Sequence, residues 1–67
     1  MILDIDIRRC AAVMIERYRD TADFEAAVRA DEYEAMGEHD VQRVWLRIAQ
    51  AVEELRSANP ERQRAKI

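Results

Sequence analysis

The chain has 67 residues, of which 49% are hydrophobic and 37% charged, and its formal net charge is −3. This length predicts a single domain with a marginal core, and the composition is typical of a folded protein rather than a disordered one. A single Cys and a single His exclude an internal disulfide and the usual structural zinc sites. No apolar run approaches the ~20 residues of a membrane helix, and a free thiol favours the cytosol.

The first predicted helix covers residues 5–18. Its N-terminus can be capped by Asp4 or Asp6. Apolar side chains follow it at helical spacing: Ile7, Cys10, Ala11, Met14, Ile15 and Tyr18. Cys10 belongs to this row, so it is predicted to be a small buried residue rather than a reactive thiol.

The second predicted helix covers residues 22–36, with Thr21 as its N-cap and Gly37 as the left-handed residue that ends it. One face of it is lined by Phe24, Ala27, Val28, Asp31 and Ala35, and because Asp31 interrupts the apolar residues this stripe is weaker than the other two.

The third predicted helix covers residues 41–57, after Asp40 as cap and before the stop at Asn59-Pro60. Its row is Val41, Val44, Trp45, Ile48, Val52 and Leu55. Because short connections make sequential helices antiparallel neighbours, we expect an all-α fold, an antiparallel up-down-up three-helix bundle over residues 1–57. Residues 58–67 are expected to form a polar, mobile tail. The predicted core is Met14, Ile15, Phe24, Val28, Val44, Ile48 and Val52.

Three segments carry a resemblance: EAAVRAD (25–31), QRVWLRI (42–48) and AVEEL (51–55), with ERYRD upstream. They resemble a group of small alphaproteobacterial proteins of unknown function, over roughly residues 5–56. The resemblance implies a helical bacterial cytosolic protein and assigns no functional residue. A Gly often follows the RY pair in that group, whereas Arg19 stands there in this chain.

The sequence offers no pattern of catalytic or cofactor-binding residues. There is one Gly, hence no glycine-rich phosphate loop, and no Ser or Cys lies in a nucleophile motif. Glu38, His39 and Asp40 lack the spacing of a known metal loop and are interpreted as solvated residues at a turn. We therefore predict no enzyme, no cofactor and no metal site.

Charge is unevenly distributed, with a balance of −6 over residues 1–40 and +3 over residues 41–67. An up-down-up bundle would gather Asp4, Asp6 and the acids of residues 31–40 at one pole. Arg43 and Arg47, one turn apart, could join the basic tail to contact phosphates in a nucleic-acid-binding accessory or regulatory protein. The net negative charge makes nucleic acid the weaker alternative.

Three apolar residues, one on each predicted helix, fall outside the core rows: Val13, Tyr33 and Leu46, with Trp45 at the border of its row. Single exposed apolar residues are ordinary, but a small domain with little core gains by covering such residues with another copy. We therefore predict a structural or protein-interaction module that self-associates, most simply as a homodimer, or binds another protein. The predicted interface residues are Val13, Tyr33, Trp45 and Leu46.

Overall fold

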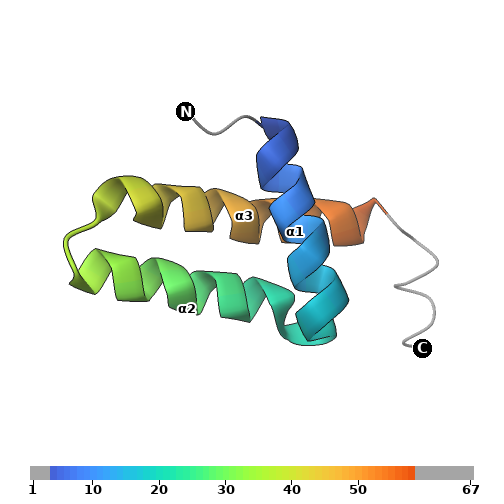
Figure 1. The fold of residues 1–67 in the computed structure, drawn as a ribbon. Coiled ribbons are helices and arrows are strands. Elements are labelled where there is room, and N and C mark those ends of the chain that lie inside the picture. Colours follow the sequence, from blue (N-terminus) through green and yellow to red (C-terminus); the bar gives the residue numbers. More distant parts are fainter. Residues whose placement is uncertain (1–3, 59–67) are drawn as a thin grey trace.

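The structure, a computed structural model, describes residues 4–58, and these are almost entirely helical (Figure 1). Helix α1 spans Asp4–Tyr18, the 3-10 turn η1 spans Arg19–Thr21, α2 spans Ala22–Ala35 and α3 spans His39–Ser57. No strand occurs among these residues, so the all-α class is confirmed. The helix ends agree with the predicted ones to within two residues, whereas the predicted mobile tail lies almost wholly outside the described residues.

Helices α2 and α3 form an antiparallel hairpin, and Gly37 builds its turn (Figure 1). Gly37 has a φ of 77° and its N–H donates to the carbonyl of Glu34 at 3.0 Å, while the N–H of Glu38 donates to the carbonyl of Tyr33 at 2.9 Å. This pair of hydrogen bonds is a Schellman motif, which satisfies the last carbonyls of α2. The predicted left-handed glycine is therefore confirmed.

Helix α1 crosses α3 steeply instead of lying along the hairpin (Figure 1). This differs from the predicted up-down-up alignment. The turn that redirects the chain is Arg19, which has a positive φ of 54°. A glycine-type end of α1 is thus present, although it is built with an arginine, which accepts the left-handed conformation less readily than Gly.

The core lies where the three helices meet, and it is rich in alanine. Five of the ten buried hydrophobic residues are Ala, and the largest side chains that are fully buried are Ile48 and Val52. Residues from all three helices share one cluster: Ile7, Ala11, Met14, Ile15, Ala22, Ala26, Ile48, Ala51 and Val52. Small side chains let helix backbones approach closely. The core is therefore filled by closely packed helices rather than by large side chains.

The predicted buried face of α2 is wrong. The buried row is Ala22, Ala26 and Ala30, spaced four residues apart, while Phe24 is 64% exposed. Phe24 is two residues from Ala22 and Ala26, which places it about 200° around the helix from either one. The prediction followed the larger apolar side chains, whereas the close approach of α2 selects the smallest ones.

Three further local predictions need correction. Cys10 is exposed and is not a buried residue of the α1 core. The N-cap of α3 is Glu38 rather than Asp40, which lies in its first turn. Thr21 is the N-cap of α2 as predicted, but its hydroxyl makes no cap bond and donates to the carbonyl of Tyr18 at 3.0 Å instead.

Candidate functional site

The predicted interface residues fall into two environments. Leu46 is 47% exposed and Val13 is 50% exposed, whereas Trp45 and Tyr33 are half-buried. Trp45 packs against the core cluster. Leu46 and Val13 are therefore open to a partner, while Trp45 is already largely accommodated within its own copy.

The sequence missed three other large apolar residues at the surface. Ile5, Phe24 and Met36 are each more than half exposed. Phe24 was assigned to the core, and Ile5 and Met36 lie close to helix ends, where a periodic pattern does not fix their orientation. Each of α1, α2 and α3 thus carries at least one exposed large hydrophobic side chain.

Arg29 explains how Trp45 is accommodated. The centre of its guanidinium lies 5.3 Å from the Tyr18 ring centroid and 5.5 Å from the Trp45 ring centroid. It also donates hydrogen bonds to the Tyr18 hydroxyl at 3.0 Å and to the Glu25 carboxylate at 3.3 Å. Partial burial alone would lower the pKa of Arg29, but these hydrogen bonds raise it above its ordinary value. The stack joins all three helices, and only the Glu25–Arg29 spacing could have indicated it from the sequence.

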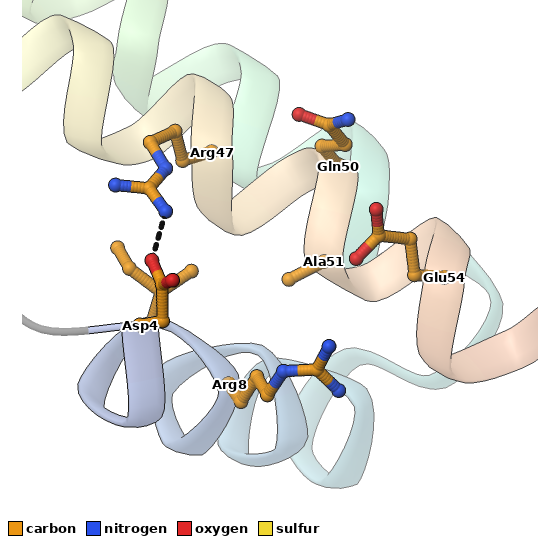
Figure 2. A pocket seen from close by; sticks show the side chains of 7 residues that line it. Asp4, Arg8, Arg47, Gln50, Ala51 and Glu54 are labelled. Atoms are coloured by element: carbon orange, nitrogen blue, oxygen red, sulfur yellow. Dashed lines mark hydrogen bonds and ion pairs between the residues drawn. The ribbon is translucent and has the colours of Figure 1, made fainter.

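An open groove of about 220 Å³ lies between α1 and α3 (Figure 2). Its lining is Asp4, Ile7, Arg8, Arg47, Gln50, Ala51 and Glu54. The side chains of Arg47 and Asp4 are joined by an ion pair across the groove (Figure 2). Two carboxylates and two guanidinium groups balance one another, so the groove favours neither anionic nor cationic ligands.

The arginines assigned to the nucleic-acid alternative both have acidic partners. Arg43 pairs with Asp40 at 3.7 Å and Arg47 pairs with Asp4. A guanidinium beside a carboxylate offers less attraction to phosphate.

The ion pair with Arg47 places Asp4 beside the middle of α3. Asp4 does not lie with the acids of residues 31–40, although the up-down-up layout predicted that it would.

Arg56 fastens the end of α3 to the α1–α2 turn. Its guanidinium donates to the carbonyl of Arg19 and pairs with Asp23 at 3.2 Å. Burial alone would raise the pKa of Asp23, but the N–H of Phe24 and the guanidinium of Arg56 together hold that pKa below its usual value of 3.8.

The lowered pKa of Asp23 predicts an acid-dependent stability. The ionised Asp23 carboxylate contributes its full share of the folding stability above pH 3.8, the ordinary pKa of an Asp side chain. This share is lost as the pH falls below 3.8 and through the lower pKa that Asp23 has in the folded chain. We expect the free energy of unfolding to decrease over this interval in urea titrations monitored by circular dichroism. Asp23→Asn should remove this part of the pH dependence. An identical pH profile for the natural chain and the variant would contradict the assignment.

No group of three or more His, Cys, Asp and Glu side chains among residues 4–58 is placed to hold a metal ion. Within the same range, no helix combines the length and apolar character needed to cross a bilayer.

Comparisons of the chain with protein-family models, with curated proteins and with solved structures returned no match.

Proposed function

We propose that this chain is a small helical interaction module that self-associates in the cytosol. The proposal rests mainly on one contrast: the core is rich in alanine, while five large hydrophobic side chains are exposed, namely Ile5, Val13, Phe24, Met36 and Leu46. The proposal treats α1, α2 and α3 as one three-helix unit, because residues from each helix share the buried cluster. An exposed free Cys10 supports a reducing compartment, where thiols stay unpaired.

The energetics support association through the exposed apolar side chains, and a second copy is the simplest partner because two-fold homodimers are the commonest oligomers. Covering ~400 Å² of apolar surface per chain would contribute on the order of 10 kcal/mol before the costs of association. That is comparable to the whole stability of a domain of this size. Leu46 is the residue that we place at the contact, because it lies on α3 away from the buried Ile48 and Val52 and is not covered in its own copy.

Leu46→Glu should lower the mass measured by light scattering at micromolar concentration from that of two chains towards the 7.9 kDa of one. A carboxylate at an apolar contact loses hydration without gaining a partner. The helix content measured by circular dichroism should not change, because Leu46 does not belong to the buried cluster.

The matched control is Ser57→Glu, which adds the same charge at an exposed position at the far end of α3, about 16 Å from Leu46 along the helix. It should leave the mass unchanged. An unchanged mass for Leu46→Glu would remove Leu46 from the interface. A natural chain with the mass of one copy would remove the proposal itself.

A further inference from the structure

The connection between α1 and α2 is short and strained at one residue. Tyr18 and Thr21 have φ values of −112° and −100°, and Ala22 has helical angles of −58° and −42°. Arg19 alone among residues 4–35 has a positive φ, 54°. The left-handed conformation brings the Cβ of an L-residue too close to the following carbonyl oxygen. One arginine therefore interrupts an otherwise right-handed run of backbone.

Nothing in the sequence of this connection forbids a continuous helix. The only Gly and the only Pro of the chain are Gly37 and Pro60. If Arg19 takes a helical φ, residues 4–35 can form one uninterrupted helix. Extending the helix would separate α1 from its own α2–α3 hairpin and expose its buried side chains Ile7, Ala11, Met14 and Ile15.

We propose that α1 is exchanged between two copies, so that each α1 packs on the hairpin of the other chain. This rests on the proposed self-association: the contact at Leu46 brings two copies together, and the exchange specifies where each α1 packs. The receiving surface already exists, because Ile48, Ala51 and Val52 of any copy belong to the buried cluster that also contains the α1 residues Ile7, Ala11, Met14 and Ile15. The exchange keeps these contacts, relieves the left-handed Arg19 and adds backbone hydrogen bonds, at the cost of association. Short hinges under strain favour such exchange.

The two turns of the chain differ in a way that selects α1 as the exchanged element. The α2–α3 turn uses Gly37, for which a φ of 77° costs little. The α1–α2 turn uses Arg19 at a φ of 54°, which a residue with a Cβ adopts less readily. One side chain holds this turn closed, because the guanidinium of Arg56 donates to the carbonyl of Arg19. In a continuous helix that carbonyl would accept the N–H of Asp23 instead. The hydrogen bond from Arg56 therefore stabilises the closed turn, whereas the left-handed conformation of Arg19 destabilises it.

Cross-linking between two labelled chains tests the exchange. Asp4 of α1 and Arg47 of α3 are in contact, and removing an exposed ion pair costs little stability. One chain carries Asp4→Cys and the other carries Arg47→Cys, both with Cys10→Ser, and the two are refolded together from urea and treated with a short bismaleimide. We expect a covalent dimer in the mixture that neither chain forms alone.

A double variant with both cysteines in one chain, treated at micromolar concentration, provides the reciprocal result. Exchange predicts links between chains, whereas a closed chain links within itself. A mixture without a covalent dimer, together with a double variant linked only within itself, would overturn the exchange. If light scattering still shows two chains, the dimer of the proposed function remains and only its geometry is rejected. If it shows one chain, both proposals fail.

Two substitutions at the hinge separate exchange from a chance proximity of residues 4 and 47 in another kind of dimer. Arg19→Gly should lower the association constant of the dimer at least about tenfold, because Gly adopts the closed turn without strain and disfavours the continuous helix. Arg19→Ala keeps the Cβ and the helix preference, so it should preserve the covalent dimer. Equal dimerisation of the two variants would also overturn the exchange.

Discussion

Ile48→Ala is expected to lower the free energy of unfolding by about 3 kcal/mol, measured by urea titration with circular dichroism at low protein concentration. Ile48 is 2% exposed and is one of the two largest side chains that are fully buried. Truncation removes apolar contacts and leaves a cavity that rigid helices close only in part. A loss of this size is a large share of the stability of a 67-residue domain, so the variant should be partly unfolded at 37 °C.

The matched control is Leu46→Ala on the same helix. Leu46 is 47% exposed, so the same kind of truncation should change the free energy of unfolding by no more than about 0.5 kcal/mol in the monomer. Equal losses for the two variants would show that the core does not lie where α3 faces α1 and α2.

Ala26→Leu is expected to lower the free energy of unfolding by about 2 kcal/mol, the second large effect. Ala26 is completely buried within the shared cluster. Three additional carbon atoms would push α2 away from its neighbours, because close-packed helices have no space for them. Thermal unfolding followed by circular dichroism should show a lower midpoint, and near-ultraviolet signals should show loosened aromatic packing.

The control for Ala26→Leu is Ala35→Leu, at an exposed position of the same helix. It adds the same atoms to solvent and should leave the midpoint nearly unchanged. A stabilised Ala26→Leu variant would show that the alanine row of α2 borders an unfilled cavity, which would contradict the close approach of the helices.

The helices could be predicted from the sequence because local signals define them. Gly37 ends α2 through its conformational freedom, and the apolar spacing of α3 fixes its buried face. The direction of α1 could not be predicted, because it depends on a left-handed Arg19 that no propensity favours. The buried face of α2 was misjudged because apolar size suggested Phe24, while close packing selected Ala22, Ala26 and Ala30.

The candidate site was accessible to sequence reasoning only in part. The position of Leu46 outside the core row of α3 follows from helical periodicity and is confirmed by its exposure. Its role in an interface remains a prediction. The stack of Arg29 between Tyr18 and Trp45 joins residues that lie far apart in the sequence, so it emerges only once the helices are packed together.

This stack gives the chain a built-in optical reporter. Trp45 is the single tryptophan, and through Arg29 it contacts both α2 and the last residue of α1. Loosening of either joint would change the surroundings of one indole ring, so its emission spectrum would register partial opening of the hairpin and release of α1 without any added dye.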